Sequence, residues 1–125
     1  MTAPRRPKHL ALQHIRLPLP GWISILHRAS GALLFLALPA LLWLWQQSLR
    51  SVGTFTELAN WLALPPVKLV LIVLWWAFCH HLCAGIRYLL IDLNCISGLT
   101  GARRSSRWVL AASLTLTLLG GWRLC

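Results

Sequence analysis

The sequence predicts an all-α integral membrane protein with three transmembrane helices, and two observations lead to this prediction. Hydrophobic residues make up 58% of the chain and charged residues only 11%, whereas about a quarter of the residues in a soluble domain are charged. The few charged residues are also separated by three long uncharged segments. A length of 125 residues allows one domain, so residues 1–125 are interpreted as a single membrane domain.

The first uncharged segment covers residues 29–49 and has 21 residues. About 20 residues at a rise of 1.5 Å cross a hydrocarbon layer of ~30 Å. Pro39 lies inside this segment, and we expect a kink there rather than a break, because neighbouring membrane helices can satisfy the carbonyl group that proline leaves free. The first span is therefore expected over about residues 24–49.

The second uncharged segment has 18 residues and lies between Lys68 and Arg87. Pro65 and Pro66 stand just before it, and proline is well tolerated at the start of a helix. We therefore expect the second span over about residues 66–92.

The third uncharged segment, residues 108–122, has only 15 residues. It crosses a membrane if the Arg123 side chain extends to the interface, or if the membrane is locally thin. The third span is expected over about residues 107–124, and the loop 50–64 is a candidate for a short interfacial helix.

The charge distribution argues against a nucleic-acid-binding protein, although the formal net charge is +10. Nucleic-acid binders carry many charges of both signs, whereas the basic residues here are sparse and separated by apolar segments. Glu57 and Asp92 are the two acidic residues, so paired carboxylates of the glycosidase kind are absent from the sequence.

Basic residues determine the expected orientation, because loops on the cytoplasmic side carry an excess of Lys and Arg. Nine lie on the side of the N-terminal segment 1–23 and the loop 93–107: Arg5, Arg6, Lys8, Arg16, Arg28, Arg87, Arg103, Arg104 and Arg107. Three lie on the other side: Arg50, Lys68 and Arg123. We therefore expect a bacterial inner-membrane protein with a proline-rich, irregular N-terminal segment in the cytoplasm and Cys125 in the periplasm. The mitochondrial inner membrane, with the matrix as the inner side, is the alternative.

The segment Cys79-His80-His81-Leu82-Cys83 resembles a metal cluster at first sight. Consecutive residues on a helix point about 100° apart, so these side chains cannot converge on one ion. Structural zinc needs four convergent ligands, and we expect the thiols to act as small apolar side chains.

His81 is a different case, because polar groups deep in a membrane are costly and commonly functional. It lies six residues before Arg87, about 9 Å deeper at 1.5 Å per residue. Ala77 and Gly85, one turn away on either side, predict a flat recess for a large planar ring such as haem. The alternative is a histidine that bonds to a carbonyl or hydroxyl group of a neighbouring helix, with close packing at Gly85. His80 points elsewhere and is expected at a helix contact or the interface.

A second polar cluster lies at the expected cytoplasmic edge of the first span. Ser24, His27, Arg28 and Gly31 are spaced to share one helix face. A hydroxyl, an imidazole and a guanidinium group together suit a polar head group that takes up protons, or an acidic one. The alternative is an arginine that marks the membrane border beside a serine that starts the helix. This cluster and the segment from His81 to Arg87 are expected in the same leaflet.

Two sequence signatures resemble the succinate dehydrogenase cytochrome b subunit family. The first comprises Arg6-Pro7 to Leu10, Ile15-Arg16-Leu17-Pro18, and Ser24-Ile25-Leu26-His27-Arg28-Ala29-Ser30-Gly31. The second is His81-x-x-x-Gly85-Ile86-Arg87-Tyr88-x-x-x-Asp92. Both occur at the expected places in a chain of typical length, so the resemblance covers the whole chain and is most specific over residues 5–31 and 81–92.

The resemblance implies the large membrane-anchor subunit of respiratory complex II. The spans would belong to a haem-binding helical bundle that a small membrane-anchor subunit completes, with an iron–sulfur subunit and a flavoprotein subunit as further partners. Electrons from succinate would pass through the partner subunits to ubiquinone, and this chain would carry out no succinate chemistry itself. Its implied cofactor is haem b, shared with the small anchor subunit.

The resemblance also implies roles for individual residues. His81 would be an axial ligand of the haem iron, and the small anchor subunit would supply the other axial histidine. Ser24 and Arg28 would line the ubiquinone pocket, with His27 near a haem propionate. From its charge and depth, Arg87 is also expected near a propionate. Many relatives carry histidine where this chain has Tyr88, and the spacing to Gly85 selects His81 over His80 as the ligand.

Two alternatives stand beside this interpretation. Within the same class, the chain would anchor a fumarate reductase or another membrane dehydrogenase with b-type haem, and the type of quinone would discriminate. From a different class, it would be a membrane scaffold or assembly protein without a cofactor.

Overall fold

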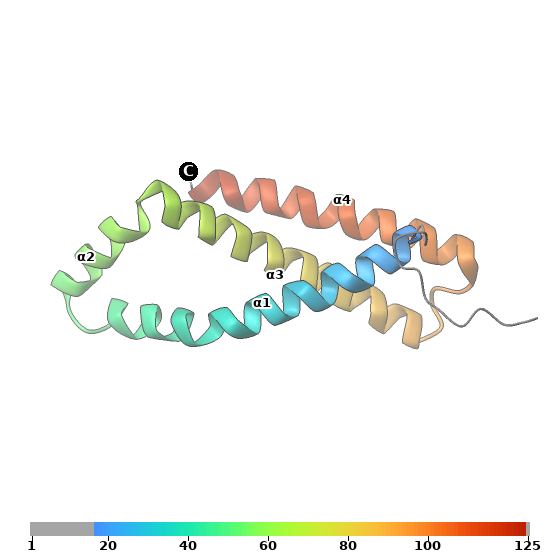
Figure 1. The fold of residues 1–125 in the computed structure, drawn as a ribbon, viewed down its shortest axis with the longest axis horizontal. Coiled ribbons are helices and arrows are strands. Elements are labelled where there is room, and N and C mark those ends of the chain that lie inside the picture. The colour runs from blue at the N-terminus through green and yellow to red at the C-terminus, as the bar shows by residue number, and fades with distance from the viewer. Residues whose placement is uncertain (1–16, 125) are drawn as a thin grey trace, which may run out of the picture.

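The computed structural model describes residues 17–124, and these residues form four helices. Three are long, namely α1 (Leu19–Ser48), α3 (Pro65–Asp92) and α4 (Gly98–Leu124), and the short α2 (Val52–Leu62) joins α1 to α3. The long helices run along one another, with α3 packed against both α1 and α4 (Figure 1). The predicted all-α class is therefore confirmed for the described part of the chain.

Prolines start two of the long helices, as the sequence predicted for α3. Pro65 and Pro66 occupy the first positions of α3, and Pro20 lies in the first turn of α1. The fixed φ angle of proline suits the first helical turn, where its missing N–H group would have no partner. Helix α1 therefore begins at Leu19 and includes residues 19–23, which were expected to be irregular; residues 1–16 lie outside the described residues. The helix also continues through Pro39 without a break.

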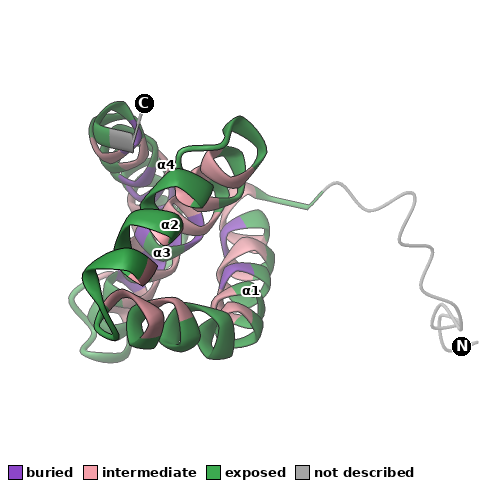
Figure 2. Ribbon diagram, turned by 90° about the vertical axis from the view of Figure 1, so that its left-hand side faces the viewer, coloured by how far each residue is buried: buried purple, intermediate pink, exposed green. Residues whose placement is uncertain are grey.

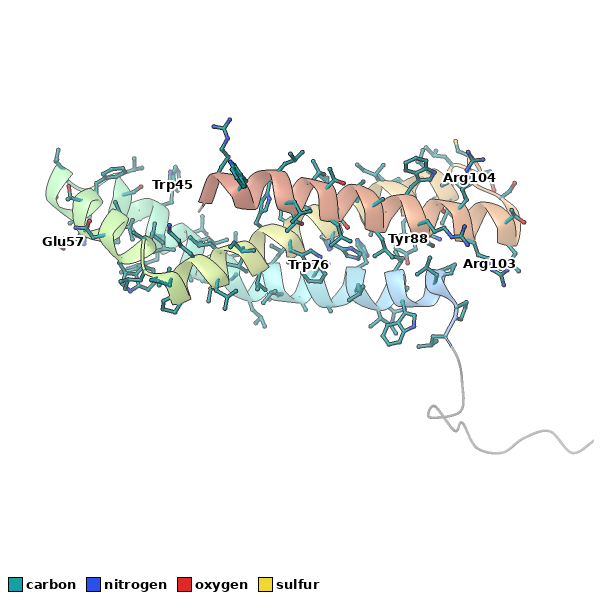
Figure 3. The ribbon with its side chains drawn as sticks, turned by 90° about the horizontal axis from the view of Figure 1, so that it is seen from above. Trp45, Glu57, Trp76, Tyr88, Arg103 and Arg104 are labelled. Carbon is teal, nitrogen blue, oxygen red and sulfur yellow. The ribbon has the colours of Figure 1, made fainter. Side chains whose placement is uncertain are left out.

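The turn between α3 and α4 is much shorter than the predicted loop 93–107. Helix α4 begins at Gly98, so Arg103 and Arg104 lie inside it, at the end of α4 that is near the start of α1 (Figure 3). Asn94 and Gly98 have φ angles of 57° and 71°, and such left-handed residues reverse the chain within a few positions. The length of an uncharged segment predicts the apolar part of a helix but not its ends, so helix α4 extends beyond the span expected over about residues 107–124, which stays a prediction.

Two helices of the described chain, α1 and α3, are long and apolar enough to cross a membrane by length and composition. The third span stays a prediction, but α4 is fastened to α3 at both ends. Near its start, Ser105 Oγ accepts a hydrogen bond from Arg87 Nε at 2.9 Å. Near its other end, the Leu116 carbonyl oxygen accepts one from Trp75 Nε1 at 3.1 Å. Helix α4 therefore runs antiparallel to α3 along much of its length.

Little of the chain is buried within its own fold. Ile23, Ala84 and Val109, from three different helices, form a small core, while large apolar side chains such as Phe35 and Leu36 are exposed. Most of the ribbon is coloured as exposed or intermediate (Figure 2). Exposed apolar surface of this extent is typical of proteins that contact lipid or partner helices.

The short helix α2 confirms the helix predicted within residues 50–64, while its interfacial position stays a prediction. Ser51 caps it: Ser51 Oγ accepts a hydrogen bond from the Thr54 backbone N–H, and Thr54 Oγ1 accepts one from the Ser51 backbone N–H, both at 3.1 Å. This reciprocal pair satisfies two backbone donors that a helix start leaves free. Glu57 lies on α2, at the end of the molecule opposite to Arg103 and Arg104 (Figure 3).

Gly120 makes the contact between α3 and α4 possible at the end opposite to Arg87. A Cβ atom at Gly120 would overlap the Trp75 indole, whereas one at Gly121 would meet nothing within 4 Å. We expect Gly120→Ala to destabilise the protein by about 1–3 kcal/mol through overpacking, and Gly121→Ala to be nearly neutral. Thermal unfolding of the detergent-solubilised protein measures both. Equal unfolding temperatures for the two variants would contradict the close packing at Trp75.

Candidate functional site

His81 lies where α3 crosses α1, and one of its ring nitrogens is engaged by α1. Nδ1 is 3.1 Å from the His27 carbonyl oxygen and 3.4 Å from Ser30 Oγ. A carbonyl oxygen only accepts hydrogen bonds, so Nδ1 carries the proton and donates it. The other nitrogen, Nε2, then has a free lone pair, and no group within residues 17–124 forms a hydrogen bond with it. Metal-binding histidines have this arrangement, because a bond at one nitrogen orients the other toward the metal.

This geometry combines the two alternatives that the sequence left open for His81. The bond to a carbonyl group of a neighbouring helix is present at Nδ1, and Nε2 is still available as a ligand. A hydrogen-bonded histidine and a haem ligand are therefore compatible roles for the same side chain.

The surroundings of His81 differ from the predicted flat recess. The His27 ring stacks on the His81 ring, with centroids 4.3 Å apart and planes 10° apart. The same ring covers Gly85, where a Cβ atom would lie 3.6 Å from His27 Nε2. The prediction of an open recess on the Gly85 side is wrong, because it considered α3 alone and α1 crosses at this level.

Gly31 of α1 lies close against the His81 ring. A Cβ atom at Gly31 would lie 2.7 Å from His81 Cε1 and 3.1 Å from Nδ1. The sequence placed Gly31 on the face of the polar cluster but did not connect it to His81. The sequence did not predict that Ser30, which is buried at 1% exposure, contacts His81. The available signal was the pair of small residues Ser30 and Gly31, which follows shortly after Arg28.

Ser24 and Arg28 lie one turn apart on the same face of α1, as predicted. Arg28 Nη2 donates a hydrogen bond to Ser24 Oγ at 3.2 Å. Arg28 is exposed and Ser24 is half-buried. The pair is held together and open to a molecule or subunit outside the chain.

Arg87 is not brought together with the other predicted site residues. It is buried against α4, where Nε donates to Ser105 Oγ at 2.9 Å and Nη2 donates to the Ala102 carbonyl oxygen at 3.3 Å. Its guanidinium group also lies 5.3 Å from the centre of the Tyr88 ring. The structure thus shows Arg87 fastening α3 to α4, and its expected approach to a propionate stays a prediction.

His80 is fully enclosed by the chain's own helices, which agrees with a helix contact and not with an interfacial position. It has 0% exposure, its ring stacks on Trp76 at 5.6 Å, and neither ring nitrogen forms a hydrogen bond within the described residues. A large cofactor cannot reach a side chain in this position without moving the helices. Of the two adjacent histidines, His81, at the crossing with α1, is therefore better placed to contact a cofactor.

The amino-acid sequence of the chain is similar to those of known membrane proteins. The profile of the succinate dehydrogenase/fumarate reductase transmembrane subunit family matches residues 2–120. The chain belongs to this family. It is 32% identical to the succinate dehydrogenase cytochrome b556 subunit of Coxiella burnetii over 120 residues, covering 94% of this chain and 96% of that protein. It is also 30% identical to the subunits of the same name from Rickettsia felis, covering 92% of this chain and 90% of the relative, and from Paracoccus denitrificans, covering 91% and 88%.

Family membership confirms the resemblance found in the two signatures. The chain is a membrane protein of the succinate dehydrogenase cytochrome b subunit type, and such subunits work in a complex with other subunits. The aligned regions include Ser24, His27, Arg28 and His81.

Proposed function

We propose that this chain is the large membrane-anchor cytochrome b subunit of a bacterial succinate dehydrogenase. In this role it helps to bind haem b and ubiquinone, so that electrons from succinate reduce the quinone. The observation that carries the proposal is the His81 imidazole, whose Nδ1 donates to the His27 carbonyl oxygen and whose Nε2 is left with a free lone pair.

The free Nε2 atom of His81 supports a role in binding a b-type haem. Nε2 of His81 would bind the iron, and a histidine of the small membrane-anchor subunit would be the other protein ligand. When bound, haem b supplies a one-electron redox centre whose potential depends on its axial ligands and burial. His27 would lie near a haem propionate, and its stacking on the His81 ring supports a place beside the haem. The bonds of Arg87 to α4 give no support for a propionate contact there.

Ser24 and Arg28 are suited to a quinone head group. The Ser24 hydroxyl would donate a hydrogen bond to one quinone carbonyl oxygen, and Arg28 would stabilise the negative charge that develops on the quinone oxygen during reduction. Such charge stabilisation is stronger in a water-poor pocket than in water. The contact between Arg28 and Ser24 at 3.2 Å supports a shared site, which the iron–sulfur and small anchor subunits would enclose.

A fumarate reductase anchor is the second candidate within the family, because the family description covers both enzymes. The relatives reported above all carry the name of succinate dehydrogenase, which favours that enzyme. Family membership argues against a membrane scaffold without a cofactor.

Purification of the complex through a tag on this chain tests the proposal. A flavoprotein, an iron–sulfur subunit and a small anchor subunit should co-purify, with a b-type haem spectrum and succinate-driven reduction of ubiquinone. A complex that lacks b-type haem would overturn the cofactor role. Preferential turnover with menaquinol and fumarate would favour the second candidate.

The proposed topology places the start of α1 and the turn between α3 and α4 in the cytoplasm, with α4 as the third span. Cys95 is exposed in that turn, whereas Cys125 lies outside the described residues. In a Cys125→Ser background, a membrane-impermeant maleimide should label Cys95 in inverted vesicles but not in spheroplasts. Ala59→Cys, exposed on α2, should show the opposite pattern when Cys95 is also replaced by Ser. Labelling of Cys95 in spheroplasts would reverse the topology.

A further inference from the structure

We propose that Ser30 and Gly31 of α1 are positioning residues for His81. Ser30 helps to hold Nδ1 of the imidazole, and Gly31 provides the space for the ring, so that Nε2 would be available as a ligand of the haem iron. The inference rests on the proposed function and deepens it, because it makes α1 responsible for the orientation of a ligand that belongs to α3.

Ser30 provides a second acceptor for the Nδ1 proton. Its hydroxyl donates to the His27 carbonyl oxygen at 3.0 Å, which uses its single hydrogen. The lone pairs of Ser30 Oγ then face Nδ1 of His81 at 3.4 Å, beside the carbonyl oxygen at 3.1 Å. With both acceptors on α1, the tautomer with hydrogen on Nδ1 is favoured, and this tautomer presents Nε2 as the metal ligand.

The position of Gly31 controls where the ring lies. His81 Cε1 is the atom between the two ring nitrogens, and it would be 2.7 Å from a Cβ atom at Gly31. Real Cβ atoms do not approach so closely, so an alanine at this position moves the imidazole or separates the helices. Either change redirects Nε2. Gly21 in the same helix is a suitable comparison, because a Cβ atom there would make contacts of 3.5 Å or more.

Ser113 provides a matched control for Ser30. It is also a fully buried helical serine, and its Oγ donates to the carbonyl oxygen three residues earlier, that of Leu110, at 3.2 Å. It lies on α4 and has no contact with His81 among its hydrogen bonds. Ser113→Ala therefore removes the same kind of local hydrogen bond and the same side-chain volume as Ser30→Ala, but it leaves the contacts of the His81 imidazole unchanged.

The experiment compares Ser30→Ala, Ser113→Ala, Gly31→Ala and Gly21→Ala in the purified complete complex. Two properties are measured: the rate of haem loss to excess apomyoglobin, and the electron paramagnetic resonance g-values of the oxidised low-spin haem. Loss of a partner of a metal-bound histidine typically weakens metal binding by 10–100-fold. We expect Ser30→Ala and Gly31→Ala to shift the g-values and to speed haem loss by about tenfold or more, and both controls to behave as the unmodified complex.

The outcomes separate this inference from the proposed function. If the unmodified complex contains b-type haem and Ser30→Ala matches Ser113→Ala in both properties, Ser30 has only a helix-packing role and the inference is overturned. If the unmodified complex contains no b-type haem, the proposed function fails and the inference fails with it. Should Gly31→Ala not assemble, the pair of serine variants still decides.

Discussion

His81→Leu removes the low-spin b-type haem spectrum of the purified complex, whereas His80→Leu leaves it intact. This result is expected because Nε2 of His81 is free of hydrogen bonds within the described chain, while His80 is enclosed at 0% exposure. Leucine replaces either ring with a side chain of similar size and no ligand atom. The absorption spectrum of the dithionite-reduced complex, normalised to its flavin content, measures the haem.

His80→Leu is a strict control, because the two residues are adjacent and His80 is enclosed at 0% exposure. Neither ring nitrogen of His80 has a hydrogen-bond partner in the described structure, so its replacement breaks no bond of the fold. The reverse pattern, with haem lost in His80→Leu and kept in His81→Leu, would show that the ligand is the preceding histidine. Loss of haem in both variants, together with loss of the partner subunits, would indicate failed assembly.

Arg28→Leu lowers succinate-driven ubiquinone reduction by about 10²–10³-fold, which is the usual effect of removing one donor from a site that stabilises a developing oxyanion. Electron transfer from succinate to a soluble artificial acceptor should continue, because that path ends before the membrane subunits. Ser24→Ala should lower quinone reduction in the same direction, since its hydroxyl lies 3.2 Å from Arg28 Nη2. The ratio of the two activities in one preparation is the deciding measurement.

Arg123→Leu is the control for removal of an exposed basic residue from a long helix. Arg123 is exposed near the end of α4, away from Ser24 and Arg28, and its replacement should leave the ratio unchanged. An equal loss of both activities in Arg28→Leu would mean that the substitution disrupts assembly. Unchanged quinone reduction would place the quinone pocket elsewhere.

The sequence by itself determined the features that depend on residues close together along the chain. The spacing of Ser24 and Arg28 predicted a shared helix face, and their side chains bond to each other. The prolines at 65 and 66 predicted the start of α3. The uncharged segments predicted three long helices, and the loop 50–64 predicted the short helix α2. A helix has a fixed number of residues per turn, so short-range spacing converts directly into geometry.

Only the tertiary structure decided which residues meet across helices. His81 and its acceptors on α1 are separated by 51 and 54 positions in the sequence, and nothing in the spacing on α3 indicates which turn of α1 crosses there. The crossing depends on Gly31, whose missing side chain admits the imidazole. The partner of Arg87 was decided in the same way: a short turn brings α4 back along α3, so the guanidinium group bonds to Ser105. A contact between two helices depends on the shapes of both helix surfaces. The residue pattern along one helix describes only its own surface.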